Sequence, residues 1–292
     1  MILNAMCIAC IVKQQEESIA AETDESKKLA FIKDVLKILY DNADTESAPV
    51  TTEFISAARK RYFGEDENLQ ALKEKYNRVM LRHEKQIEAR VLASADPLAA
   101  AIRFARTGNY IDFGAMGDID DRKLEELLRG APAEELDAHE YARFTCELKS
   151  AKRAAYLTDN CGEIVMDKLL LRELKRQNPC LHIDVIVRGR PVLNDATRAD
   201  AEMVGIDREA HIIENGTGAA GTDLKRISPE AKDALAQADF ILSKGQGNFE
   251  SLHGCGMNIY YLFLCKCDWF VRRFGLERFK GVFIHESGHQ IR

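Results

Sequence analysis

Residues 156–167, Tyr-Leu-Thr-Asp-Asn-Cys-Gly-Glu-Ile-Val-Met-Asp, contain the change from strand to helix that decides the fold of this chain. The apolar run 154–157 is typical of a buried strand, and a helical pattern begins at Glu163. Between them stand a carboxylate, Asp159, and a carboxamide, Asn160. In an open α/β sheet, ligands bind in the loop between a strand's carboxyl end and the next helix. The stretch therefore predicts an α/β fold with a ligand site at this loop.

The residues of this loop favour a divalent cation beside a phosphate. Asp159 and Asn160 offer two hard oxygen ligands, which suit Mg²⁺ or Mn²⁺. Gly162 lets the backbone turn, and the helix N-terminus that follows favours an anion such as phosphate. The simpler alternative is that Asp159 only caps the helix. Polar loops after the later strands favour the ligand site over capping alone.

Outward from this stretch, short β-rich runs alternate with helical segments. The expected strands are 154–158, 182–187, 210–213, 240–243, 259–264 and 282–285, and the expected helices are 163–177, 196–204, 229–238, 248–253 and 268–274. This alternation predicts a parallel sheet that is covered by helices on both faces.

Before residue 150 the hydrophobic spacing is helical. Helices are expected over 29–40, from about 51 to 64, and over 68–93, 98–106, 121–129 and 133–149, with a loop at 112–117. The apolar segment 2–12 lacks the basic region and the cleavage site of a signal peptide, so it predicts a buried first helix. We therefore expect two domains, 1–150 all helical and 151–292 α/β.

The composition predicts a globular protein of the cytoplasm. Of the 292 residues, 46% are hydrophobic and 30% are charged, which supplies ample material for a core. The net charge of −6, without a long basic run, argues against nucleic acid as the main partner, and no apolar run is long enough to span a bilayer. Eight cysteines scattered through a chain of this length indicate reduced thiols, not a disulfide framework.

Later loops repeat the polar pattern at the same predicted edge of the sheet. Arg188 ends the second strand, and Asn194 and Asp195 stand just before the next helix, where capping is again the simple alternative. The glycine-rich segment 214–222 offers backbone amides to an anion. Lys244 follows the fourth strand, where an ammonium would neutralise phosphate charge. Together these loops predict one metal and phosphate site.

Segments 159–167, 188–197 and 244–250, in this order, resemble the DUF89 family, the ARMT1-like damage-control phosphatases. Cys7-Ile8-Ala9-Cys10 is similar to the Cys-x-x-Cys of the family's prokaryotic branch. The resemblance implies a helical N-terminal domain packed on a Rossmann-like, three-layer α/β/α domain with a mostly parallel sheet. The implied activity is divalent-metal-dependent hydrolysis of small phosphate monoesters, such as sugar phosphates or damaged phosphometabolites.

The resemblance also implies roles for individual residues. One divalent ion, Mg²⁺ or Mn²⁺ with Co²⁺ or Ni²⁺ as alternatives, would be bound by Asp159, Asn160 and Asp195. The catalytic group would comprise Asp159, Asn160, Lys244 and Glu163, and the substrate-binding group Asn194, Lys244, Arg188 and Thr222. The implied partner is a small phosphorylated metabolite, while the oligomeric state stays open.

Two other functions remain open at this stage. A sensor or carrier would bind a phosphorylated metabolite through the same loops without turnover. A methyltransferase would need a glycine-rich adenosylmethionine loop after the first strand, where Asp159 and Asn160 stand instead. For a phosphatase, the nucleophile is either water, with Glu163 or Asp159 as the base, or a carboxylate that forms an aspartyl phosphate.

Three motifs fit other functions only formally. The segment 285–289, His-Glu-Ser-Gly-His, matches a zinc-protease pattern, but it follows a strand and contains a glycine. Gly245-Gln246-Gly247 half-matches a dinucleotide fingerprint late in the chain. Cys7 and Cys10 are expected mainly to pack on one helix face, with a metal site completed by 265–267 or a redox pair as alternatives.

Overall fold

A computed structural model of the chain describes residues 1–65, 68–109, 121–131 and 135–287. Its N-terminal half contains α1 (Ala5–Ser18), α2 (Glu25–Asn42), α3 (Ala48–Phe63), α4 (Leu69–Leu92), α5 (Pro97–Gly108), α7 (Asp121–Gly130) and α8 (Ala138–Ser150). The remainder contains β1 (Arg153–Leu157), α9 (Glu163–Gln177), β2 (His182–Val187), α10 (Arg198–Val204), the 3₁₀ helix η2 (Ile206–Arg208), β3 (His211–Glu214), α11 (Pro229–Gln237), β4 (Phe240–Lys244), α12 (Gln246–Leu252), β5 (Ile259–Leu264), α13 (Asp268–Phe274) and β6 (Gly281–His285).

The predicted strands are all present within a residue at each end, which confirms the α/β class. The helix expected over 133–149 begins later, at Ala138, because the Asp137 side chain caps it by accepting from the amides of His139 and Glu140. The loop expected at 112–117 lies outside the described residues.

The strands form a mostly parallel sheet with the order β3-β2-β1-β4-β5-β6. β1 pairs with β2 on one side and with β4 on the other, while β6 runs antiparallel to β5. The chain moves outward from β1 to β3 and then crosses back to β4. Loops that follow β1 and β4 therefore leave the sheet at a switch point, where open α/β sheets bind ligands.

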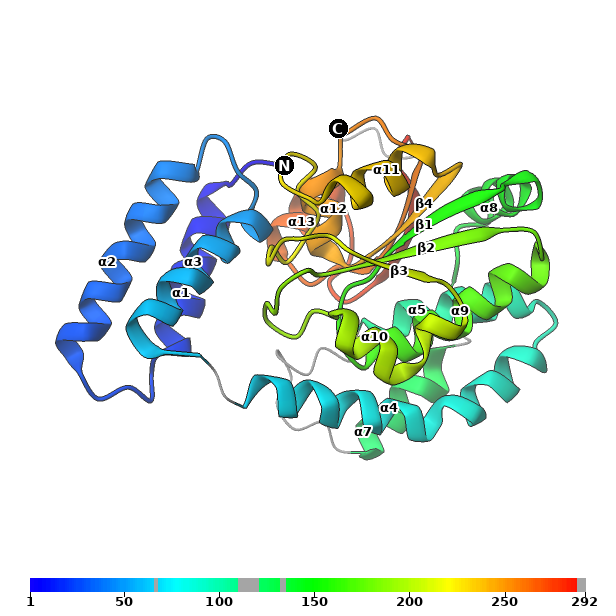
Figure 1. Cartoon of the computed structure of the whole chain (residues 1–292), viewed down its shortest axis with the longest axis horizontal. Helices are drawn as coiled ribbons and strands as arrows, with labels where there is room; N and C mark the ends of the chain where they lie inside the picture. The colour runs from blue at the N-terminus through cyan, green and yellow to red at the C-terminus, as the bar shows by residue number, and fades with distance from the viewer. Residues whose placement is uncertain (66–67, 110–120, 132–134, 288–292) are drawn as a thin grey trace.

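The two faces of the sheet bury different helices, because strand side chains alternate. Ala154 and Tyr156 of β1 pack with α5, α8 and α9, whereas Ala155 and Leu157 pack with α11 and α12. Figure 1 shows α5, α9 and α10 on one side of the sheet and α11 and α12 on the other. The predicted three-layer α/β/α arrangement is thus present.

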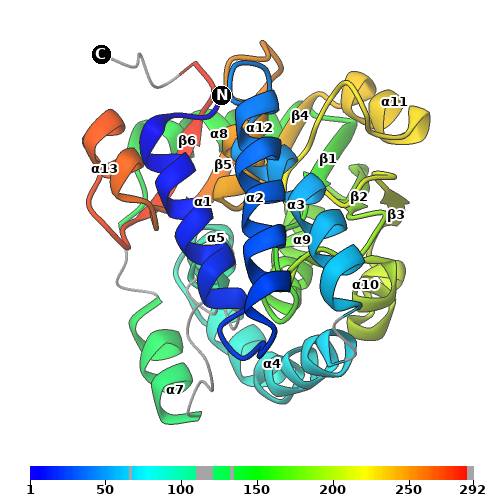
Figure 2. The same cartoon turned by 90° about the vertical axis from the view of Figure 1, so that its left-hand side faces the viewer.

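One hydrophobic core crosses the predicted domain boundary at residue 150. Tyr76 of α4, Phe104 of α5 and Phe144 of α8 belong to the same cluster as Tyr156 of β1 and Leu170 of α9. By contrast, α1, α2 and α3, which lie side by side in Figures 1 and 2, have a core of their own. The boundary marks a change in sequence pattern, while the packing continues through it.

The first helix is present, but its predicted burial is wrong. Within α1 only Ile11 is buried, and Asn4 caps the helix by accepting from the amides of Met6 and Cys7. Cys7 is half-buried and packs against the core of α1, α2 and α3, as predicted, whereas Cys10 is exposed. All eight cysteines are free thiols, and no described helix is long and apolar enough to cross a membrane.

Candidate active site at the carboxyl edge of the sheet

The loops after β1 and β2 are joined to each other by their backbones. Asn160 and Asp195 form an isolated antiparallel bridge. The Cys161 amide donates to the Asn194 carbonyl at 2.8 Å, and the Ala196 amide donates to the Asp159 carbonyl at 2.7 Å. This pairing brings the three predicted metal ligands, Asp159, Asn160 and Asp195, to one place.

Two carboxamides hold a pair of carboxylates together at this place. Asn160 Nδ2 donates to Asp159 Oδ2 at 2.7 Å and to Glu163 Oε2 at 3.0 Å. Asn109 Nδ2, at the end of α5, donates to the same two oxygens at 2.8 and 2.9 Å. Burial, together with the neighbouring charges of Glu163 and Asp195, raises the pKa of Asp159 to about 8. Crowded acids of this kind are stabilised by a cation.

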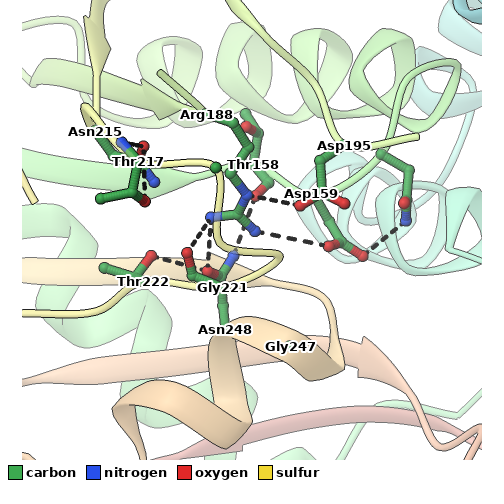
Figure 3. A network of polar contacts seen from close by, with 12 residues as sticks. Thr158, Asp159, Arg188, Asp195, Asn215, Thr217, Gly221, Thr222, Gly247 and Asn248 are labelled. Atoms are coloured by element: carbon green, nitrogen blue, oxygen red, sulfur yellow. Dashed lines mark hydrogen bonds and ion pairs between the residues drawn. The ribbon is translucent and has the colours of Figure 1, made fainter. Parts of the chain in front are cut away.

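Arg188 lies buried between the acidic group and the loops after β3 and β4, as Figure 3 shows. Its Nε donates to Asp195 Oδ2 at 2.6 Å, and Nη1 donates to the Gly221 carbonyl at 2.9 Å. Nη2 is 4.0 Å from Asp159 Oδ1 and has no hydrogen-bond partner among the described residues. Nε and Nη1 therefore fix the guanidinium, and the N–H donors of Nη2 remain on the side that faces Asp159.

Asn248 of α12 connects the four loops. Its Nδ2 donates to the carbonyls of Thr158 and Lys244 at 3.1 and 2.7 Å. Its Oδ1 accepts from Arg188 Nη1 at 3.1 Å and from the Thr222 hydroxyl at 2.8 Å. The loops after β1, β2, β3 and β4 therefore meet at one edge of the sheet, through a carboxamide for which the sequence motifs predict no role.

Lys244 occupies a different position from the predicted contact with phosphate. Its side chain is fully buried, and Nζ donates to Glu163 Oε1 at 2.5 Å, Asp167 Oδ1 at 2.6 Å and the Ala105 carbonyl at 2.9 Å. These contacts use the three donors of the ammonium. The cause is strand alternation, since Phe240 and Leu242 of β4 face the α5–α9 layer and Lys244 follows them.

The buried charged groups around Lys244 shift one another's pKa values. Burial lowers the pKa of Lys244, but Asp167 and Glu163 outweigh it and hold that pKa above its ordinary value. Burial raises the pKa of Asp167 to about 6 even though Lys244 opposes the change. Glu163 therefore has a fixed cation on one side and the carboxamides of Asn109 and Asn160 on the other.

Gly245 leaves room for the Asp159 carboxylate. Its φ is +81°, and a Cβ at this position would collide with the carboxylate of Asp159. Any other residue would meet both backbone strain and this clash, so the glycine after β4 helps to seat the side chain after β1.

Two remaining predicted substrate contacts serve the framework in this structure. Thr222 is fully buried, its hydroxyl donates to Asn248, and its amide donates to Ser251 Oγ at 2.8 Å. Asn194 is half-buried and contributes its backbone carbonyl to Cys161.

Two residues of α4 for which no role is predicted from the sequence hold the loop after β1. Asn77 Oδ1 accepts from the Gly162 amide at 2.6 Å, and Asn77 Nδ2 donates to Asp200 Oδ1 at 2.9 Å. Lys73 Nζ lies 2.6 Å from Asp200 Oδ2. A signal was present, because positions 73 and 77 share the buried stripe of α4 with Tyr76 and Met80. Polar side chains within an apolar stripe are candidates for a buried contact.

The model of the damage-control phosphatase ARMT1-like domain matches residues 3–281 of this chain. The chain belongs to this family. A damage-control phosphatase of Archaeoglobus fulgidus is 30% identical to this ARMT1-like protein over 282 residues, covering 94% of the chain and 96% of the relative. A damage-control phosphatase of Pyrococcus horikoshii is 33% identical over 170 residues, covering 57% and 58%. A crystal structure of a DUF89 family protein from P. horikoshii has the same fold, with a TM-score of 0.86, 24% identity, and coverage of 98% and 99%.

Proposed function

We propose that this chain is a divalent-metal-dependent phosphatase of the cytoplasm that hydrolyses small phosphate monoesters, such as sugar phosphates or damaged phosphometabolites. The observation that carries the proposal is the meeting of Asp159, Glu163 and Asp195 with Nη2 of Arg188 at one sheet edge. Among the described residues, this Nη2 is a buried donor without a hydrogen-bond partner. Membership of a family whose relatives are named damage-control phosphatases supports the activity.

The residues present fit a divalent cation. Asp159, Asn160 and Asp195 would hold it through oxygen atoms, the ligand type that suits Mg²⁺ or Mn²⁺, with Co²⁺ or Ni²⁺ as alternatives. Asn160 turns its amide nitrogen to Asp159 in this structure and would offer the oxygen of the same group to an ion. A bound ion would polarise a phosphoryl oxygen and offset its charge.

Arg188 is suited to bind the phosphoryl group. Its Nε and Nη1 are held by Asp195, Gly221 and Asn248, so Nη2 is oriented before any substrate arrives. A donor that is oriented in advance stabilises the charge of the transition state without reorganising. The amino end of α9, which begins at Glu163, adds a dipole that favours an anion.

Lys244 would act through Glu163. Its ion pair fixes the Glu163 carboxylate, and Glu163 in turn accepts from Asn109 and Asn160, both of which contact Asp159. Lys244 would therefore influence Asp159 indirectly, through the hydrogen bonds that link Glu163 to Asn109 and Asn160. This positioning role replaces the predicted direct contact with substrate.

Two routes lead to hydrolysis with these residues. In the first, a water oxygen forms the new bond to phosphorus, the bond to the leaving oxygen breaks, and Asp159 or Glu163 accepts the water proton. In the second, a carboxylate oxygen forms the new bond to phosphorus as the bond to the leaving oxygen breaks, and water then cleaves the aspartyl phosphate to release phosphate and the carboxylate. Quenching the reaction with labelled substrate and searching for a phosphorylated Asp159 peptide separates the two routes.

The activity itself is tested by a screen of phosphorylated metabolites with Mn²⁺, with Mg²⁺ and with a chelator. We expect phosphate release that requires the metal and that returns when the metal is restored. Tight binding of phosphometabolites without any release would instead indicate a sensor. Binding of adenosylmethionine in a parallel titration would indicate the methyltransferase alternative, which nothing in the loop after β1 favours.

A further inference from the structure

A second group of ligand-type side chains lies at the opposite, amino edge of the sheet. His182 and Asp184 are two residues apart on β2, so they point to the same face. His211 is the first residue of β3 and is the register partner of Asp184 in the parallel pair. Strand register therefore brings two imidazoles and one carboxylate together, and this edge is remote from the loops that hold Asp159.

The ligand atoms are already close to the spacing that a metal ion requires. His182 Nε2 and His211 Nδ1 each lie 3.0 Å from Asp184 Oδ1, and all three atoms lie within 4.8 Å of one another. Four ligands at about 2.0–2.1 Å from a zinc ion are about 3.3 Å apart in a tetrahedron. Little movement would be needed to place an ion between them.

Arg153 of β1 orients the Asp184 carboxylate through the oxygen that does not contact the histidines. Its Nη2 donates to the other oxygen, Asp184 Oδ2, at 2.9 Å, which leaves Oδ1 for the two histidines. Although burial raises it, hydrogen bonds from His211, His182 and Arg153 hold the pKa of Asp184 below its ordinary value. An ionised carboxylate fixed by an outer partner is the arrangement that supports metal ligands in proteins.

Access also favours an ion at this place. The side chains of His182 and His211 are 50% and 54% exposed, whereas that of Asp184 is 3% exposed. Among the residues that the structure describes, these three form the one group of histidine, cysteine and carboxylate atoms with such spacing.

We propose that His182, Asp184 and His211 bind a zinc-type divalent ion, with water in the remaining coordination positions. Two imidazole nitrogens and one carboxylate oxygen are a zinc donor set, in contrast to the oxygen donors around Asp159. Because β3 is an edge strand of the sheet, the ion would tie it to β2. The site is independent of the proposed phosphatase activity.

Isothermal titration with ZnCl₂ in excess Mg²⁺ tests this site, because Mg²⁺ competes at oxygen donors and poorly at imidazoles. We expect one zinc per chain. Loss of a partner outside the coordination shell costs about 10–100-fold in affinity, so His182→Ala or His211→Ala should cost about 100-fold or more. His139→Ala, at an exposed histidine of α8, is the matched control and should bind zinc like the natural chain.

Two further measurements distinguish the proposed zinc site from the proposed metal site at Asp159. Zinc should raise the thermal midpoint of the natural chain and of Asp195→Asn, but not that of His211→Ala, since a ligand stabilises only a fold that binds it. Manganese-dependent phosphate release should be unchanged in His211→Ala. Equal zinc affinity in the natural chain and in both histidine variants, or no zinc bound by any of them, would overturn the proposal.

Discussion

At the scale of single residues, Asp159 has the most unfavourable environment in the proposed active site. Its carboxylate is packed over Gly245, and burial, Glu163 and Asp195 all oppose its charge. Hydrogen bonds from Asn109 and Asn160 compensate in part. A protein does not gain stability from such crowding, so the arrangement makes physical sense as a place prepared for a cation.

The proposed metal ligands give the first prediction. Asp159→Ala and Asp195→Asn should abolish both the bound divalent ion and phosphate release, because each removes a charged ligand, whereas Asn160→Ala should be milder. Metal content by mass spectrometry and initial rates measure the two effects. Asp233→Asn, at an exposed carboxylate of α11, is the control and should behave like the natural chain. An Asp159→Ala protein that is active without bound metal would contradict the proposed metal site.

Lys244 gives a prediction about stability as well as turnover. Lys244→Met would leave Glu163 and Asp167 buried without their cation, and removing one partner of a buried pair costs about 3–5 kcal/mol. Urea unfolding measures this loss. Turnover per folded molecule should fall as well, because Glu163 would lose the ion pair that fixes its carboxylate.

Lys225→Met is the matched control for Lys244→Met, since Lys225 is exposed in the loop before α11. It should change the free energy of unfolding by no more than about 0.5 kcal/mol. If Lys244→Met unfolds at the same urea concentration as this control, the buried ion pairs do not exist in solution.

At the scale of elements, α4 acts as a support for the first active-site loop. Its buried polar residues contact both the Gly162 amide and the Asp200 carboxylate. Asp200 also accepts from the amide and hydroxyl of Thr197 at the start of α10. One helix of the N-terminal half therefore positions two loops of the α/β half.

Asn77→Ala should weaken this support. The Gly162 amide would be left buried without a partner, which costs about 1–3 kcal/mol. The KM for substrate and the turnover should both change, since the loop carries Asp159 and Asn160. Arg78→Ala, one position along on the exposed side of α4, should change neither the unfolding midpoint nor the rate.

For the thiols of α1 we predict almost no effect on stability or turnover. Because Cys7 is only half-buried and Cys10 is exposed, the double variant Cys7→Ser, Cys10→Ser should lose little stability and keep its turnover per folded molecule. Unfolding curves and rates, each with and without reductant, provide the measurement. Loss of a stoichiometric zinc, or of redox-dependent activity, in the double variant would show that the pair has a chemical role.

At the scale of the whole molecule, the proposed active site depends on contacts between distant parts of the chain. Lys244 contacts Ala105 and Asn109 contacts Asp159, each across the residue 150 boundary. Glu53 of α3 accepts from Arg190 at 2.5 Å and from the Gly218 amide at 2.8 Å, next to the loops after β2 and β3. The helical half thus completes both the core and the surroundings of the site.

Separation of the two halves tests this dependence. A fragment of residues 151–292 should not form a cooperative fold, because α4, α5 and α8 cover apolar side chains on one face of its sheet. Circular dichroism and thermal unfolding of the fragment provide the measurement. A sharp unfolding transition in the isolated fragment would show that residue 150 is a true domain boundary.

The sequence by itself determined the class of the fold and located the loops of the proposed site. Alternation along strands and the spacing of apolar residues along helices are local properties, so β1 to β6 and the helices between them could be located without tertiary information. The loop residues Asp159, Asn160, Arg188 and Asp195 followed from their places at strand ends, since parallel strands present these ends at one edge.

Only the tertiary structure decided which side chains face one another. Lys244 points to Glu163 and Asp167 because β4 pairs with β1 and so lies under α9, and no local pattern reveals that pairing. Asn77 and Asn109 belong to helices whose contacts lie about 50 to 120 residues away in the chain. A side chain's partner depends on how elements pack, and hydrophobic periodicity specifies which face is buried but not against what.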